Sequence, residues 1–174
     1  DGNSFRPGDV LTASNGKTIE ITNTVAEGRL VLADALAYAA RYSPAAVVDL
    51  ATLTGACVVA LGNDTAAGLF SNDDGLRDQF VAAGNATFER AWPMPIFPEH
   101  SREMKSDVAD LTNASGNRAG GACTAAAFLK EFTAYPWVHL DIAGMAFSGK
   151  AQPYSSKGAT GYGVRLLMNW LAAS

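Results

Sequence analysis

The sequence lacks the motifs that most directly reveal a function. It has two histidines and two cysteines in 174 residues, and their spacing fits neither a zinc finger nor a disulfide framework. No Gly-x-Ser-x-Gly motif occurs, so a serine hydrolase of the α/β-hydrolase type is not indicated. Neither a phosphate-binding glycine loop nor a dinucleotide-binding fingerprint is present.

Excess positive charge and long apolar runs are absent as well. The 13 Lys and Arg residues are outnumbered by 17 Asp and Glu residues, so we expect no nucleic-acid partner. Apolar runs such as residues 56–61 are far shorter than the roughly 20 residues of a membrane-spanning helix, so we expect no membrane partner. We expect a cytoplasmic protein in which Cys57 and Cys123 are buried, reduced thiols. The chain begins with Asp1 and shows no secretory signal.

Hydrophobic residues make up 48% of the chain, which is typical of a globular protein. Segments with strand-like patterns alternate with segments that have helical spacing. The predicted strands are residues 17–23, 45–50, 66–71 and 138–142. The predicted helices are residues 28–42, 54–61, 122–133 and 162–172. A further helix is expected to begin at a cap formed by Asn72 or Asp73 and to end near Gly84, and a helical turn is expected at 98–100. Residues 105–121, with a short element at 108–111, and 148–161 are expected to be surface segments.

This alternation predicts an α/β fold with parallel character. By length, residues 1–174 are expected to form a single domain. Ligands of such sheets gather beyond the carboxyl ends of the strands. Both the loop at residues 23–30 and the turn at residues 52–55 fall at such ends.

Residues 23–30 read Asn-Thr-Val-Ala-Glu-Gly-Arg-Leu and are the most informative segment. They resemble the Asn-Thr-Asp-Ala-Glu-Gly-Arg-Leu signature of the leucyl aminopeptidase (cytosol aminopeptidase) family, with Val25 in place of the aspartate. Further segments resemble the family in the same order, so that the similarity covers essentially the whole chain; they are residues 1–11, 49–56, 120–129, 137–144 and 157–161.

The chain resembles the C-terminal part of the family's metallopeptidase catalytic domain, without the upstream half that holds most of the metal ligands. The resemblance therefore implies a partial catalytic domain. It also implies a three-layer helix–sheet–helix fold around a mixed, largely parallel sheet. Family members assemble as hexamers, so we expect a homo-oligomer.

The resemblance further implies a site for two divalent metals, manganese or zinc, which hydrolyse N-terminal residues from peptides. Glu27 matches a metal ligand, Val25 stands where an aspartate ligand is lost, and Arg29 matches the catalytic arginine. Only one of the family's five ligand side chains has a counterpart, so we expect the metals to be absent or weakly bound. An anion site near Arg29 is expected to survive that loss.

Five residues resemble the wall of the family's substrate side-chain pocket; they are Thr52, Leu53, Gly55, Ala143 and Gly144. Close packing at strand ends would equally favour the small residues among them. Glu27 would also suit the positive end of a helix without any metal, and Arg29 could pair with Asp34 or Glu27 at the surface.

Three functional hypotheses remain open at this point. The first is a hydrolase scaffold that acts on peptides in the family but is impaired or inactive as a peptidase in this chain. The second is a metal-independent esterase that uses the residual pocket on small esters. The third is a non-enzymatic structural or assembly module.

Overall fold

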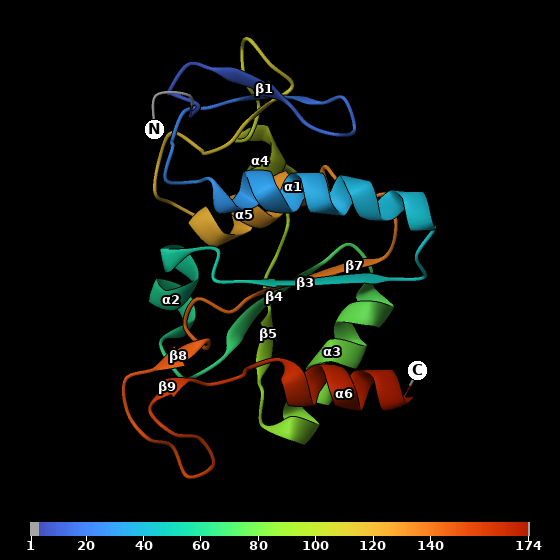
Figure 1. The fold of residues 1–174 in the computed structure, drawn as a ribbon, viewed down its shortest axis with the longest axis vertical. Helices are drawn as coiled ribbons and strands as arrows, with labels where there is room; N and C mark the ends of the chain where they lie inside the picture. Colours follow the sequence, from blue (N-terminus) through green and yellow to red (C-terminus); the bar gives the residue numbers. More distant parts are fainter. Residues whose placement is uncertain (1–3, 174) are drawn as a thin grey trace. The chain divides into compact units, whose positions relative to one another are not determined.

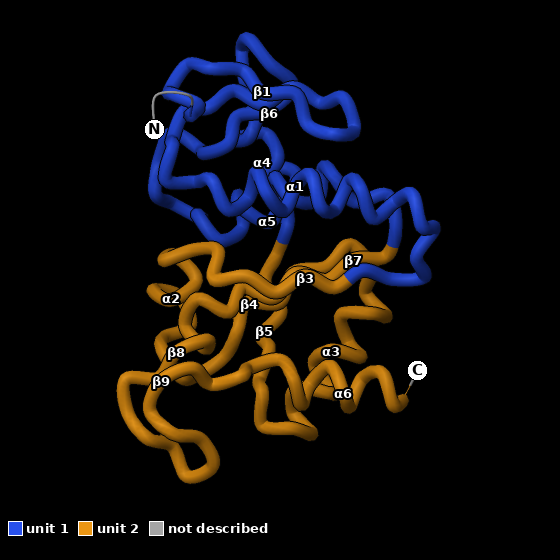
Figure 2. Tube along the Cα trace, viewed as in Figure 1, with its two compact units in different colours: residues 1–47, 96–135 blue, residues 48–95, 136–174 orange. Residues whose placement is uncertain are grey.

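The computed structural model describes residues 4–173. The chain divides into two compact units, each built from two separate stretches of sequence (Figure 2). Unit 1 comprises residues 1–47 and 96–135, and unit 2 comprises residues 48–95 and 136–174. Whether the chain behaves as a single domain stays a prediction.

Unit 1 contains a small sheet and three helices. In the sheet, β1 (Val10–Thr12) pairs antiparallel with β2 (Thr18–Glu20), and β2 pairs parallel with β6 (Leu111–Thr112). The helices are α1 (Gly28–Ala39), which continues into the 3-10 turn η1 (Ala40–Tyr42), α4 (Pro98–Arg102) and α5 (Gly121–Lys130). Helix α5 contacts both α1 and α4.

Helix α5 forms much of the core of unit 1. Residues 122–129 are all buried, and four of these eight residues are alanines. Small side chains allow neighbouring elements to approach a helix closely on every side, which explains why this helix has no polar face.

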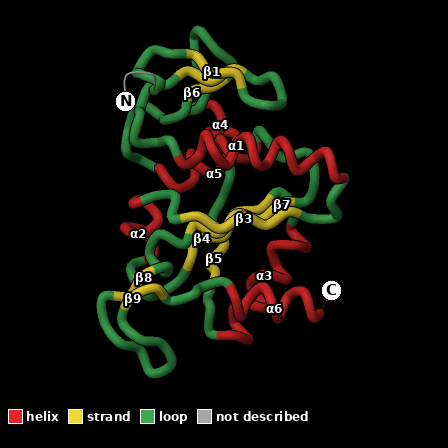
Figure 3. Tube along the Cα trace, viewed as in Figure 1, coloured by secondary structure: helices red, strands yellow, loops and turns green. Residues whose placement is uncertain are grey.

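Unit 2 is built on a four-stranded sheet of order β3-β7-β4-β5 (Figures 1 and 3). The strands are β3 (Val47–Ala51), β4 (Ala67–Ser71), β5 (Ala91–Pro93) and β7 (Trp137–Asp141). Strand β4 runs parallel to β5 and antiparallel to β7, so the sheet is mixed.

Helices α2 (Gly55–Leu61), α3 (Asp74–Thr87) and α6 (Val164–Ala173) complete unit 2. Helix α3 packs between the sheet and α6, while α2 contacts β4. A separate two-stranded ribbon joins β8 (Phe147–Ser148) to β9 (Gly158–Ala159).

A buried carboxylate fixes the start of α6. Glu89 is 3% exposed, and its Oε2 atom accepts hydrogen bonds from Gly163 N at 3.1 Å and Leu166 N at 2.8 Å. The Tyr162 hydroxyl donates to Arg90 O at 2.9 Å. Burial and the nearby Glu89 charge raise the pKa of Tyr162, so its hydroxyl stays protonated.

The α/β class and the mixed sheet predicted from the sequence are confirmed, and each long predicted element is found within a few residues of its expected bounds. Four short strands were missed: β1 and β5, together with β8 and β9, which overlap the segment 148–161 predicted as loop. Strands of two or three residues are too short to show alternation. Strand β5 also ends in Pro93, which its position at the edge of the sheet tolerates.

The two histidines have structural partners. His139 Nδ1 lies 2.6 Å from Asp49 Oδ1, and Asp49 Oδ2 accepts a hydrogen bond from Trp137 Nε1 at 2.7 Å. His100 Nδ1 accepts from Phe97 N at 3.0 Å. Within residues 4–173 neither ring is hydrogen-bonded to a serine, and both cysteines are buried thiols that form no disulfide, as predicted.

Candidate functional site

The signature residues 23–27 form the connection between β2 and α1 in unit 1. Asn23 Oδ1 accepts a hydrogen bond from Val25 N at 2.9 Å, and Asn23 O accepts one from Ala26 N at 3.2 Å. This is the turn that an Asn side chain typically stabilises. The Val25 side chain is 84% exposed, so it contributes little packing to this loop.

Asn113, which follows β6, holds this loop in place through hydrogen bonds of its side-chain amide. Its Oδ1 atom accepts from Thr22 N at 2.9 Å and from Asn23 N at 3.1 Å. Its Nδ2 atom donates to Asn23 O at 2.7 Å and, at 3.4 Å, to Ala26 O. Asn113 is completely buried, so the loop is tied at Thr22, Asn23 and Ala26 to one well-fixed amide side chain.

Arg29 and Glu27 lie at the start of α1. Arg29 is half-buried, and its Nη1 atom donates to Asn113 O at 2.8 Å. Glu27 is the exposed residue just before α1, and its carbonyl accepts hydrogen bonds from Leu30 N at 2.9 Å and Val31 N at 3.3 Å. The positive N-terminus of a helix favours both a carboxylate such as Glu27 and a bound anion.

The residues of this chain do not by themselves fit a two-metal centre. Across residues 4–173, no three His, Cys, Asp or Glu side chains group closely enough to hold a metal ion. Hard divalent cations take about six oxygen ligands. Glu27 supplies one carboxylate and Val25 supplies none.

The predicted pocket residues lie in unit 2, on two segments that one carboxylate connects. Asp141, the last residue of β7, is completely buried. Its Oδ1 atom accepts hydrogen bonds from Leu53 N and Ala143 N, both at 3.2 Å, and from Thr54 N at 3.4 Å. Its Oδ2 atom accepts from Thr54 Oγ1 at 2.6 Å. The turn after β3 and the turn after β7 are therefore held together.

Thr54 links the Asp141 carboxylate to the start of α2. Its Oγ1 atom accepts a hydrogen bond from Cys57 N at 3.0 Å and so caps the helix. Gly55 begins α2, and a Cβ atom there would meet nothing within 4 Å. Thr52 is exposed, so Thr52 and Gly55 border open space.

Position 144 requires glycine because the neighbouring backbone leaves no room for a side chain. A Cβ atom at Gly144 would lie 2.5 Å from Gly62 O, which is a backbone atom that cannot swing aside. Asp64 N donates to Gly144 O at 2.8 Å, which fixes the same contact from the other direction. For this residue the packing explanation considered from the sequence holds.

Neither Asn113 nor Asp141 was predicted as a site residue from the sequence. Asp141 carried a signal, because it is a carboxylate at the end of an apolar strand. No sequence pattern distinguishes Asn113, since it lies in a segment rich in Asn, Ser and Gly that contains Asn117 as well. Val25, Glu27 and Arg29 belong to unit 1, whereas the five expected pocket residues belong to unit 2.

Comparison with known proteins identifies the family to which this chain is similar. The catalytic-domain model of the cytosol aminopeptidase family matches residues 1–168. The chain is 58% identical over 172 residues to a probable cytosol aminopeptidase of Geobacter sp. (strain M21), covering 98% of the chain and 35% of that relative. It is 55% identical over 174 residues to one from Cyanothece sp. (strain PCC 7425 / ATCC 29141), covering 99% of the chain and 35% of that relative.

A third probable cytosol aminopeptidase, from Roseiflexus castenholzii, is 56% identical over 172 residues, which cover 98% of the chain and 35% of that protein. The chain thus spans about a third of the length of these relatives. In the part of the chain that the structure covers, no helix is both long and apolar enough to span a membrane. Matches of this extent and identity place the chain in the cytosol aminopeptidase family of metallopeptidases.

Proposed function

We propose that this chain carries the aminopeptidase scaffold but hydrolyses peptides slowly or not at all on its own. The observation that supports the proposal is Val25, whose aliphatic side chain projects 84% exposed from the signature loop. An aliphatic side chain offers no oxygen to a hard cation. Manganese or zinc is therefore expected to bind weakly.

The remaining parts of the scaffold suit an anion better than a metal. Asn113 holds the Arg29 guanidinium at the N-terminal end of α1, where backbone N–H groups also favour negative charge. A fixed positive charge of this kind stabilises an oxyanion during acyl transfer. This arrangement supports a second candidate function, which is the cleavage of activated esters without a metal.

For substrate recognition, we assign Thr52, Leu53, Gly55, Ala143 and Gly144 to the wall that receives the N-terminal side chain of a peptide. Asp141 supports that wall because it bonds to both of its segments. We further propose a cytoplasmic homo-oligomer without a nucleic-acid partner. Sedimentation as a monomer across a wide range of concentrations would contradict self-association.

The test measures hydrolysis of leucine anilide with added manganese or zinc, for the parent chain and for Val25→Asp. Neither chain is expected to turn over the substrate. Val25→Asp is expected to bind manganese with a dissociation constant of roughly 1 mM, the weak end of oxygen-ligand sites. Val59→Asp is the matched control, because it adds a carboxylate at another exposed valine, 88% exposed on α2 in unit 2, and is expected to bind no better than the parent.

Two outcomes would change the conclusion. Anilide turnover by the parent chain that chelator abolishes and Glu27→Gln eliminates would refute the proposed loss of peptidase activity. Cleavage of an activated leucine ester that survives chelator but is lost in Arg29→Ala would instead establish the esterase.

A further inference from the structure

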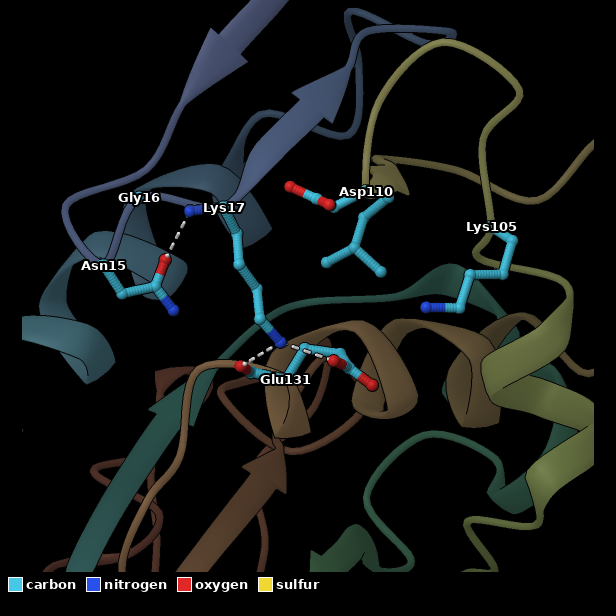
Figure 4. Close-up of a pocket in the computed structure, with 7 residues that line it drawn as sticks. Asn15, Gly16, Lys17, Lys105, Asp110 and Glu131 are labelled. Carbon is cyan, nitrogen blue, oxygen red and sulfur yellow. Dashed lines mark hydrogen bonds and ion pairs between the residues drawn. The ribbon is translucent and has the colours of Figure 1, made fainter.

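Unit 1 contains a recess that belongs neither to the signature loop nor to the pocket wall (Figure 4). Its volume is about 350 Å³, at the small end of the roughly 300–1,000 Å³ usual for small-molecule sites. It lies between the β1–β2 turn, the start of β6, the end of α5 and the segment after α4. Seven residues line it; they are Asn15, Gly16, Lys17, Lys105, Asp110, Leu111 and Glu131.

One negative group of the recess is fixed on the sheet. Asp110 Oδ2 accepts hydrogen bonds from both Thr18 N and Thr18 Oγ1 at 2.8 Å. These bonds, followed by the charges of Lys17 and Lys105, lower the pKa of Asp110 below its ordinary value. The carboxylate is therefore ionised at neutral pH, and its Oδ1 atom remains available.

An ion pair forms the second fixed group. Lys17 Nζ donates to Glu131 Oε2 at 2.6 Å and to Glu131 O at 3.0 Å. The same ammonium lies 5.9 Å from the centre of the Phe132 ring. About a third of each charged side chain is exposed, so the pair is held in place but still reaches the recess.

Other polar atoms of the lining have no partner. Within residues 4–173, no hydrogen bond or ion pair involves Lys105 Nζ, Asn15 Nδ2, Asp110 Oδ1 or Glu131 Oε1. Figure 4 shows the exposed Lys105 side chain pointing inward from the side opposite Lys17. Donors and acceptors are thus both available within one small space.

The charges of the lining select the kind of ligand. Two lysines and two carboxylates give the recess a net charge of zero. A simple anion would meet Asp110 and Glu131, and a simple cation would meet two ammonium groups, so each gains little. A molecule that carries both charges close together can pair with both signs at once.

We propose that this recess binds a small zwitterion with the chemistry of a free α-amino acid. Its carboxylate pairs with Lys105 and its ammonium pairs with Asp110. The proposal does not depend on peptidase activity, because it uses only residues outside the signature loop and the pocket wall.

Amide chemical shifts measured by NMR test this proposal with three probes. L-leucine carries both charges, leucinamide carries only the positive charge and N-acetyl-leucine carries only the negative charge. Leucine is expected to bind with a low-millimolar dissociation constant and to shift the Gly16, Lys17, Lys105 and Leu111 amides. Leucinamide and N-acetyl-leucine are expected to bind several-fold more weakly.

A pair of lysine variants provides the residue-level control. Lys105→Met is expected to weaken leucine binding about two- to fivefold, the size of effect that one exposed ion pair produces. Lys150→Met removes an exposed lysine in unit 2 outside the recess and is expected to leave the affinity unchanged. Because both side chains are exposed, both variants are expected to keep the parent spectrum elsewhere.

Three results would overturn the proposal. One is the absence of saturable shifts at these amides up to the solubility limit of leucine. Another is equal binding of leucine and either singly charged derivative, which would show that a single charge suffices. The third is an equal loss of affinity in Lys105→Met and Lys150→Met, which would indicate a nonspecific charge effect.

Discussion

Replacement of Asn113 by alanine removes the side chain that fastens the signature loop. Three of its hydrogen bonds are 3.1 Å or shorter, to Thr22 N, Asn23 N and Asn23 O. At about 1 kcal/mol for each bond, the free energy of unfolding should fall by about 3 kcal/mol. That is a large part of the roughly 5–15 kcal/mol available to a domain.

Urea unfolding followed by far-UV circular dichroism measures this loss. Hydrogen exchange locates it, because the Thr22 and Asn23 amides should exchange much faster in Asn113→Ala than in the parent chain. All three tryptophans lie in unit 2, so their fluorescence reports separately whether that unit unfolds in the same transition.

Two further variants sharpen the test. Asn85→Ala changes an exposed asparagine on α3 and should alter stability by less than about 0.5 kcal/mol. Asn113→Asp keeps the acceptor but loses the donor to Asn23 O. The introduced carboxyl is buried beside a carbonyl, so its folded pKa should be raised, with stability retained at low pH and lost as pH rises.

The role of Asn113 is refuted if Asn113→Ala changes the free energy of unfolding no more than Asn85→Ala does, with the Thr22 and Asn23 amides still protected. Such a result would mean that water or the backbone alone can hold the loop. It would also remove the reason for assigning the position of Arg29 to Asn113.

Other residues give simpler tests. Glu89→Ala leaves two backbone N–H groups at the start of α6 without their acceptor and should cost about 2–4 kcal/mol in fluorescence-monitored unfolding; an unchanged midpoint would contradict this. The pKa of Asp110 is lowered in the folded state, chiefly by its bonds to Thr18, so its stabilisation is present above the unfolded pKa and lost as pH falls through the folded value. Acid titration of Asp110→Asn should therefore show a smaller loss of stability than the parent between roughly pH 5 and pH 2. Burial of Cys57 and Cys123, which also raises the pKa of Cys123, should make both react with a thiol reagent only after unfolding, and fast labelling of the native chain would refute their protection.

Sequence patterns predicted the elements that are long enough to show a period. Helix α3, for example, was located from its cap, and Asp73 Oδ1 does accept a hydrogen bond from Leu76 N at 2.7 Å. Patterns along the chain could not predict the direction of β7 relative to β4, because 65 residues separate the two strands and either direction buries the same side chains.

The candidate site was predicted only in part, for a similar reason. The resemblance located Glu27, Arg29 and the pocket segments, since these lie in contiguous motifs. Asn113 and Asp141 act on residues more than 80 positions away. A partner at that distance leaves no local pattern in a single sequence.

The exposure of Val25 has a consequence for how this loop evolves. Asn23 and Asn113 determine the backbone of the loop, and the side chain at position 25 projects into solvent. Substitutions at position 25 should therefore change the stability of the fold very little, so selection for stability hardly acts on that position. A lineage can lose or regain the carboxylate there by a single substitution while every other contact of the loop is inherited unchanged.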